Sequence, residues 1–305
     1  MRTLLIAGLG DVARRALPEL VRHWRVFTIA HHPAAAEAAR RGGALPIMAN
    51  LDCQESLRRI AGLADDVWIT APPPGTGIRD NRTRKLLYAL AKADRIPQRI
   101  SYISTTGVYG NSAGGWLDEC SPPAPQTDRA RRRLDAETAL RDFAGRHGCQ
   151  LNILRAPGIY ALERLPLTRL LQGTPLIRPE EDSYSNHIHA DDLARLCIAS
   201  LQQNRGGIRV FNACDQEPLT ITDWYAMLAA ALSLPLPPRL SRAEVQASVS
   251  PALWSYMAES RRFRHERLQE LGITLHYPTA REFVAQLAAT PAWQAVALAK
   301  AGKIR

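Results

Sequence analysis

Residues 3–13, TLLIAGLGDVA, decide the fold. The apolar run at residues 3–7 leads directly into the pattern G-x-G-x-x-A, which Gly8, Gly10 and Ala13 form. In such a pattern the first glycine permits a tight turn and the second lets a phosphate approach the backbone. The small third residue lets a helix pack closely on the strand. The stretch therefore predicts a strand, a phosphate-binding turn and a helix whose N-terminus faces the phosphates. A tight turn without a ligand is the alternative.

Short apolar runs continue to alternate with segments of helical spacing through the first half of the chain. This alternation is typical of a parallel sheet whose two faces are covered by helices, so we expect a doubly wound α/β fold of the Rossmann type. Asp191 is the expected N-cap of the last helix beside the sheet. We expect strands at residues 3–7, 26–30, 44–49, 66–71, 99–104, 150–155 and 210–213, and helices at residues 11–23, 54–63, 79–93, 130–147 and 191–203.

The pattern loosens after Pro157 and becomes mainly helical toward the C-terminus. The capping boxes Ser241-x-x-Glu244 and Thr279-x-x-Glu282 each predict the start of a helix. We expect a smaller, mainly helical substrate-binding lobe, made of residues 157–186 and 216–305, over the carboxyl ends of the strands. Residues 1–156 and 187–215 would form the Rossmann domain.

The charge and the cysteine content narrow the class of protein. The chain of 305 residues has a net charge of +10, which favours anionic ligands, although a solvated arginine-rich surface is the simpler explanation for most of that charge. We expect no nucleic-acid partner, because aromatic residues are not interleaved with the one arginine cluster. No apolar run is long enough for a membrane span, and the first apolar run fits a strand better than a signal peptide. The five cysteines lack metal-ligand spacing and predict reduced thiols in a cytoplasmic protein.

The end of the second strand indicates which dinucleotide the glycine turn would bind. An NAD site usually has Asp or Glu there, but this strand ends in Ile29-Ala30-His31-His32. Imidazole groups suit the 2′-phosphate of NADP better than free ribose hydroxyls, so we expect NADP, with NAD as the weaker alternative. An exposed loop end without a ligand remains open for the histidine pair. Asp11 would repel phosphates unless its side chain points to solvent.

Several later segments resemble those of one large family. Residues 104–110, STTGVYG, are similar to the segment after the fifth strand of the extended short-chain dehydrogenase/reductases, which include the nucleoside-diphosphate-sugar epimerases and dehydratases. Residues 154–160, LRAPGIY, and 187–194, HIHADDLA, resemble two further segments of that family in the correct order. The resemblance covers nearly the whole chain and implies an NAD(P)-binding fold. It does not specify a substrate.

The resemblance also locates an atypical active site. In this family a Ser or Thr, a Tyr and a Lys act together, the last two as Tyr-x-x-x-Lys. Thr105 matches the hydroxyl position, but Arg129 stands at the Tyr and Arg133 at the Lys. Arg133 can still bind a ribose, whereas Arg129 cannot exchange a proton near neutral pH and would instead bind an anion or polarise a carbonyl. A further residue would then have to supply the proton; the candidates are Tyr109, Tyr160, Tyr184, Asp118 and Glu119.

The expected cofactor site collects residues at the carboxyl ends of the strands, where ligands of open α/β sheets bind. We expect no metal site: His187 and His189 would line or support the substrate cleft instead. The expected cofactor-binding residues are Gly8, Gly10, Asp11, Val12, Ala13, His31, His32, Asn50, Leu51, Ala71, Pro72, Arg133, Ala156, Pro157 and Gly158.

Two functions remain open from the sequence. One is an NADP-dependent epimerase or oxidoreductase acting on a nucleotide sugar or another small anion. The other is a non-catalytic NADP(H)-binding sensor or scaffold, which the loss of Tyr-x-x-x-Lys favours. A homodimer is a further expectation, because extended members of the family often pair through helices beside the fifth and sixth strands.

Overall fold

The computed structural model describes residues 1–302, and its centre is a seven-stranded sheet. The strands run in the order β12-β7-β5-β4-β1-β2-β3, and every neighbouring pair is parallel. The strand order reverses between β1 and β4, which is the switch point of a Rossmann-type sheet and confirms the predicted fold class. The strands are β1 (Arg2–Ala7), β2 (Trp24–Ala30), β3 (Leu45–Met48), β4 (Asp66–Ile69), β5 (Arg99–Thr105), β7 (Gln150–Ala156) and β12 (Ile208–Asn212).

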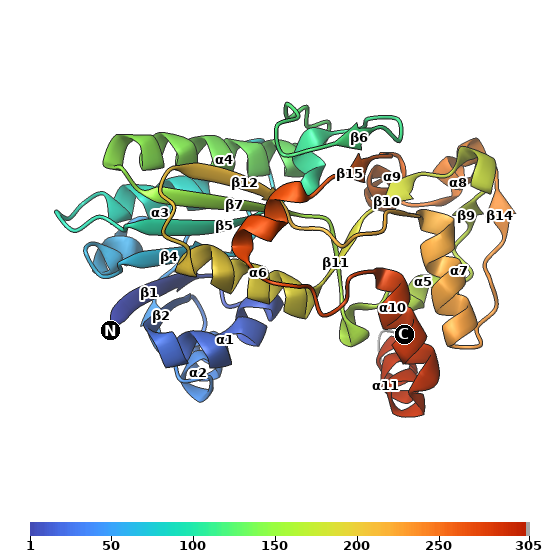
Figure 1. Cartoon of the computed structure of the whole chain (residues 1–305), viewed down its shortest axis with the longest axis horizontal. Helices are drawn as coiled ribbons and strands as arrows, with labels where there is room; N and C mark the ends of the chain where they lie inside the picture. Colours follow the sequence, from blue (N-terminus) through green and yellow to red (C-terminus); the bar gives the residue numbers. More distant parts are fainter. Residues whose placement is uncertain (303–305) are drawn as a thin grey trace.

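Helices cover both faces of this sheet (Figure 1). One apolar core lies under α1 (Asp11–His23), α2 (Pro33–Arg41) and α6 (Ala190–Gln202). The other lies under η1 (Glu55–Ile60), α3 (Asn81–Leu90) and α4 (Asp128–His147). α1, α3 and α4 bury one face against the sheet, as their spacing predicts, whereas most residues of α6 are buried.

Two local predictions need correction. The segment expected to be helical at residues 54–63 forms only the short 3₁₀ helix η1, Glu55–Ile60. Asp191 is not the N-cap of α6: that position belongs to His189, whose Nδ1 accepts from the backbone N–H of Asp191 at 3.2 Å. An imidazole in the cap position accepts the same orphan donor that a carboxylate would.

The C-terminal elements pack around a third apolar core beside the sheet, at the right of Figure 1. Tyr160, Trp224 and Phe283 lie at its centre, with ring centroids 5.2–5.6 Å apart about Tyr160. The main helices here are α5 (Leu167–Leu171), α7 (Ile221–Ala231), α8 (Arg242–Ser248), α9 (Pro251–Met257), α10 (Ala280–Ala289) and α11 (Pro291–Gly302). The capping box predicted at Ser241 and Glu244 begins α8.

Short strands join these helices to one another and to the sheet region. They are β6 (Trp116–Leu117), β8 (Gly158–Tyr160), β9 (Leu176–Ile177), β10 (Tyr184–Ser185), β11 (His187–His189), β13 (Leu219–Thr220), β14 (Arg239–Leu240) and β15 (Arg262–Phe263). β15 pairs with β6, which follows β5 in the chain. The short helices are η2 (Thr106–Tyr109), η3 (Leu162–Arg164), η4 (Pro179–Glu181) and η5 (Glu266–Leu271). Leu268 and Leu271 of η5 pack in the same core as α1 and α6. The expected domain boundaries stay a prediction, and residues 303–305 of the expected lobe lie outside the described residues.

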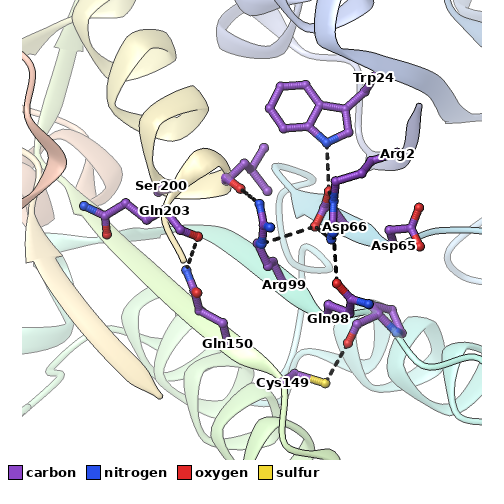
Figure 2. Close-up of polar contacts among 12 residues, drawn as sticks. Arg2, Trp24, Asp65, Asp66, Gln98, Arg99, Cys149, Gln150, Ser200 and Gln203 are labelled. Atoms are coloured by element: carbon purple, nitrogen blue, oxygen red, sulfur yellow. Dashed lines mark hydrogen bonds and ion pairs between the residues drawn. The ribbon is translucent and has the colours of Figure 1, made fainter. Parts of the chain in front are cut away.

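One buried carboxylate joins the first residues of four neighbouring strands (Figure 2). Asp66, which is fully buried, accepts from Arg2 through both oxygens at 2.7–2.8 Å and from the Trp24 indole at 2.7 Å. Arg99 lies 3.9 Å from the same carboxylate and donates to the carbonyl of Leu201 at 2.8 Å. These partners satisfy the buried carboxylate at the amino end of the sheet, so the group is structural. No helix in residues 1–302 is long and apolar enough to cross a membrane.

Candidate functional site

The two glycines of the turn after β1 meet different surroundings. Gly8 has a φ of +106°, and a Cβ added there would lie 2.7 Å from the backbone nitrogen of Ala71. That nitrogen donates to the carbonyl of Ala7 at 2.9 Å, so Gly8 lets β1 and the end of β4 approach each other. Gly10 has an ordinary φ of −77°, and a Cβ there would meet no atom within 4 Å. Packing therefore does not require a glycine at position 10, and the space in front of it is open.

The N-terminus of α1 faces this open space. Gly10 is the N-cap of α1, and because it has no side chain, no capping group accepts a hydrogen bond from the first turn. Asp11 is partly exposed, as expected, but its carboxylate is also ion-paired. It lies 3.2 Å from Arg15 on one oxygen and 3.0 Å from Arg164 on the other. Its charge is partly offset, because Arg164 pairs with it while Arg15 is shared with Glu163 and Asp191. The N–H groups of the first turn remain a place where an anion can bind.

The residues expected at the adenosine end lie on two neighbouring loops after β2 and β3. His31 is exposed, whereas His32 is the N-cap of α2 and its Nδ1 accepts from Ala34 at 3.2 Å. The Asn50 side chain accepts from the backbone of Asp52 at 2.9 Å, so it shapes its own loop. Leu51 is half-buried beside it.

One acidic group also lies in this region. The Arg82 guanidinium contacts the carboxylate of Asp52 at 2.7 Å and lowers the pKa of that carboxyl. His31 contributes to the same lowering. Basic groups thus surround the Asp52 carboxylate. The loops after β2 and β3 therefore present no unpaired acid to a ligand.

A cavity of about 440 Å³ lies where β5 and β7 end. It brings together the expected catalytic residues Thr105, Arg129 and Arg133. Ala156, Pro157 and Gly158, which were expected at the cofactor, line the same cavity. The C-terminal elements and the segment after β7 contribute further polar residues: Arg164, Tyr184, Ser185, Asn186, Ser255, Tyr256, Glu259 and Arg261.

The register of α4 depends on a buried ion pair behind this cavity. Glu137 contacts Arg155 of β7 at 2.6 Å, and both side chains are almost fully buried. Ser104 donates to the same carboxylate at 2.5 Å. Glu137 thus joins the third turn of α4 to β7 and to the end of β5, and Arg129 and Arg133, in the turns before it, line the cavity.

The three expected catalytic residues differ in what they bind. Thr105 accepts from the backbone of Gly107 at 3.2 Å and so caps η2. Arg133 donates to the carbonyl of Ile103 at 3.0 Å and to the hydroxyl of Tyr102 at 3.1 Å. Arg129 is exposed and makes no hydrogen bond or ion pair with any described residue.

Most of the residues considered as a replacement acid are engaged elsewhere. Tyr109 is buried, donates to Asn212 at 2.8 Å, and has its pKa raised by burial to about 12. Tyr160 is buried in the aromatic core, and burial raises its pKa further. Asp118 and Glu119 accept from backbone N–H groups at Ser121 and Asn212, at 2.8 and 3.2 Å. Tyr184 is the one of the five that lines the cavity.

Sequence reasoning missed a second phenol at the cavity. The hydroxyl of Tyr256, on α9, lies 3.0 Å from Oγ of Ser185, and both residues line the cavity. Ser185 Oγ is also 3.4 Å from Nε2 of His187. Tyr256 lies in a helical stretch without any motif, so no local signal could have indicated it.

Neither of the two histidines after β10 lines the cavity: His187 packs behind Gly158, and His189 caps α6. His187 is fully buried, and burial lowers the pKa of its imidazole to about 4. Its Nδ1 has no hydrogen-bond partner in the described structure. Within residues 1–302, no group of three His, Cys, Asp or Glu side chains is placed to hold a metal ion.

The sheet order, the glycine turn and the cavity at the strand ends define a Rossmann-type protein with the fold of the NAD-dependent epimerases and dehydratases. The chain belongs to the same family as a functionally unknown conserved protein from Silicibacter pomeroyi. The two are 30% identical over 95% of this chain and 99% of that one, with a TM-score of 0.76.

Two more distant structures share the fold. MoeE5, solved with UDP-glucose and NAD, is 20% identical over 97% of this chain and 99% of that one, with a TM-score of 0.73. The human epimerase family protein SDR39U1, solved with NADPH, is 18% identical over 94% of this chain and 99% of that one, with a TM-score of 0.72. No protein-family model and no curated protein sequence matches the chain.

Proposed function

We propose that this protein binds a nicotinamide dinucleotide, NADP in preference to NAD, and acts as an epimerase or reductase on a small molecule in the adjoining cavity. The open space in front of Gly10 carries the proposal. A glycine that packing does not require, placed before an uncapped helix N-terminus, is what close approach of a pyrophosphate needs. The complexes of MoeE5 with NAD and of SDR39U1 with NADPH support the same use of the fold.

The chain's own residues suit such a ligand along the strand ends. The N–H groups of Asp11, Val12 and Ala13 would bind the pyrophosphate. The loops at His31 and His32, Asn50 and Leu51, and Ala71 and Pro72 would hold the adenosine half. Ala156, Pro157 and Gly158 would lie beside the nicotinamide, with Arg133 at the ribose. When bound, the dinucleotide supplies the hydride donor or acceptor.

The preference for NADP rests on the end of β2. No acid stands directly after Ala30, and the exposed imidazole of His31 stands where an NAD site usually has a carboxylate. A neutral or protonated imidazole tolerates a 2′-phosphate, whereas a carboxylate repels it.

The cavity supplies the remaining groups for a reaction. Thr105 would bind the reacting oxygen of the substrate, as the family resemblance implies. Arg129 cannot exchange a proton there, because a guanidinium stays protonated near neutral pH. The hydroxyl groups of Tyr184 and Tyr256 are the phenols that line the cavity and would exchange a proton with the substrate.

A non-catalytic NADP(H) sensor on the same fold is the second candidate. It is favoured by Arg129 at the tyrosine position and by Arg133, whose Nη1 already donates to the backbone of β5. The two candidates differ in one observable. The enzyme consumes or regenerates dinucleotide during turnover, whereas the sensor binds it without consumption.

Thermal unfolding with and without dinucleotide tests the proposal first. NADPH at 100 times its dissociation constant should add about 2.7 kcal/mol to the stability of the folded protein, and NADH at the same concentration should add less. The variant Gly10→Asp should unfold at the same temperature as the wild type without ligand, because its side chain enters open space, and should lose the NADPH response. An equal shift with NADH would overturn the cofactor preference. No shift with either dinucleotide would overturn the proposal.

A further inference from the structure

The cavity at the ends of β5 and β7 is lined by more positive than negative side chains. Arg129, Arg133, Arg164 and Arg261 line it, and Glu259 is the acid among its lining residues. A cavity of this charge attracts an anion and repels a cation.

Three of these arginines are already occupied by protein groups. Arg133 donates to the carbonyl of Ile103. Arg164 pairs with Asp11 at 3.0 Å. Arg261 donates to the carbonyl of Gly110 at 2.7 Å and also pairs with Glu259.

Arg129 differs because no described residue accepts from its guanidinium. It lies in the first turn of α4, whose N-terminal end carries a partial positive charge. The acidic residue of that turn, Asp128, already pairs with Arg131 at 2.8 Å. The positive end of the helix disfavours the guanidinium of Arg129, and no described acidic side chain neutralises it. An anion in the cavity would therefore interact favourably with both the helix N-terminus and the Arg129 side chain.

Other lining groups indicate that the ligand also carries hydroxyls. One oxygen of Glu259 pairs with Arg261, but its Oε1 is buried and accepts no hydrogen bond in the described structure. A buried carboxylate oxygen without a donor is costly, and a ligand hydroxyl would satisfy it. The hydroxyls of Tyr256 and Ser185 line the same space and can both donate and accept.

We propose that the ligand of this cavity is a hydroxylated anion of about monosaccharide size, whose carboxylate or phosphate group binds the guanidinium of Arg129. Its hydroxyls bond to Glu259 and to the Tyr256–Ser185 pair. The proposal rests on the proposed function only in treating this cavity as the substrate site. The residue that replaces the tyrosine of the family thus selects the charge of the substrate, and a neutral sugar of the same size binds weakly.

Three sugars that differ only at carbon 6 provide the test. Glucose, glucuronate and glucose 6-phosphate are titrated by calorimetry into the protein with NADPH present. At least one of the two anions should bind about ten-fold or more tightly than glucose, because the ion pair adds charge-assisted hydrogen bonds. A preference for glucuronate identifies a carboxylate ligand, and a preference for glucose 6-phosphate identifies a phosphate ligand.

The variant Arg129→Gln should remove this preference while leaving the unfolding temperature unchanged, because the side chain is exposed. Arg131→Gln is the matched control. It removes an arginine of the same turn that pairs with Asp128 and does not line the cavity, so the preference should remain.

Three results would overturn the proposal: glucose binding as tightly as both anions, no binding of either anion up to about 10 mM, or an unchanged preference in Arg129→Gln. Failure of the proposed function is a separate result. If NADPH gives no thermal shift, the same titrations are made on the protein alone, where a preference that depends on Arg129 still supports the anion site.

Discussion

Arg129 and Arg133 lie one turn apart on α4, yet their surroundings differ. Arg133 points at the end of β5, where the carbonyl of Ile103 has room for a donor. Arg129 lies nearer the helix end, where the backbone has donors and few acceptors. The two residues therefore have separate roles. Arg133 joins the helix to the sheet through Nη1 and would use its other donors for the ribose, whereas the whole guanidinium of Arg129 is free to bind a ligand.

His187 predicts how stability changes with pH. Burial lowers the pKa of its imidazole from 6.5 to about 4, so the folded protein holds it neutral. Its contribution to the free energy of unfolding is present above pH 6.5 and is lost as the pH falls from 6.5 toward 4. The loss should be about 3 kcal/mol.

The variant His187→Phe keeps an aromatic ring beside Trp224 and Tyr160 but has no titrating group. Urea unfolding at pH 7 and pH 4.5 should show that it loses less stability than the wild type over this interval. An identical pH dependence of the two proteins would contradict the assignment.

At the scale of elements, the turn between β1 and α1 separates a folding role from a binding role. Gly8→Ala should lower the free energy of unfolding by about 2 kcal/mol or more, because its φ is positive and its Cβ would meet Ala71. Gly10→Ala should change it by less than about 0.5 kcal/mol, since its φ is ordinary and no atom lies near. Denaturant unfolding of both variants without ligand measures this difference. Equal effects would mean that packing, and not a ligand, requires both glycines.

The starts of four strands depend on one buried carboxylate (Figure 2). Asp66→Ala leaves Arg2 and the Trp24 indole without their acceptor, so it should cost about 3–5 kcal/mol. Glu55→Ala, which breaks the exposed pair with Arg58, is the control and should cost less than about 1 kcal/mol. Similar losses of stability in the two variants would show that the buried cluster contributes no more than a surface pair.

At the scale of the whole molecule, an ion pair links the glycine turn to the segment after β7. Arg164 of η3 contacts Asp11 of α1 and also lines the cavity. A dinucleotide at the turn would therefore lie beside a segment that touches the substrate. This link would let occupancy of one site affect the other.

The same ion pair predicts the effect of removing Asp11. Asp11→Asn should tighten NADPH binding by about two- to five-fold, because one negative charge near the phosphates is lost and Arg164 is released from its ion pair, while Arg15 stays paired with Glu163 and Asp191. Arg164→Gln should weaken binding by a similar factor. Fluorescence titration of NADPH measures both variants, and weaker binding by Asp11→Asn would show that its carboxylate helps to hold the ligand.

Local patterns were sufficient to predict the sheet, the glycine turn and the pocket at the strand ends. Apolar runs that alternate with helical spacing have few ways to fold other than a doubly wound sheet, because parallel strands need right-handed crossovers. The family resemblance then predicted that Thr105, Arg129 and Arg133 meet at the end of β5. Which residue exchanges the proton, and whether NADP is preferred, stay predictions.

The sequence by itself determined the fold, which follows from short-range order along the chain, and the family resemblance predicted that Arg129 stands at the position of the tyrosine. Only the tertiary structure decided which polar groups from distant parts of the chain come into contact. Tyr256 and Ser185 are 71 residues apart and share a hydrogen bond, and Glu259 reaches Arg261 with one oxygen and leaves the other without a donor. The same packing gives Arg133 its acceptors and leaves Arg129 without one. Side chains from distant segments are placed by the burial of apolar surface between the sheet and the C-terminal core, which no local pattern encodes.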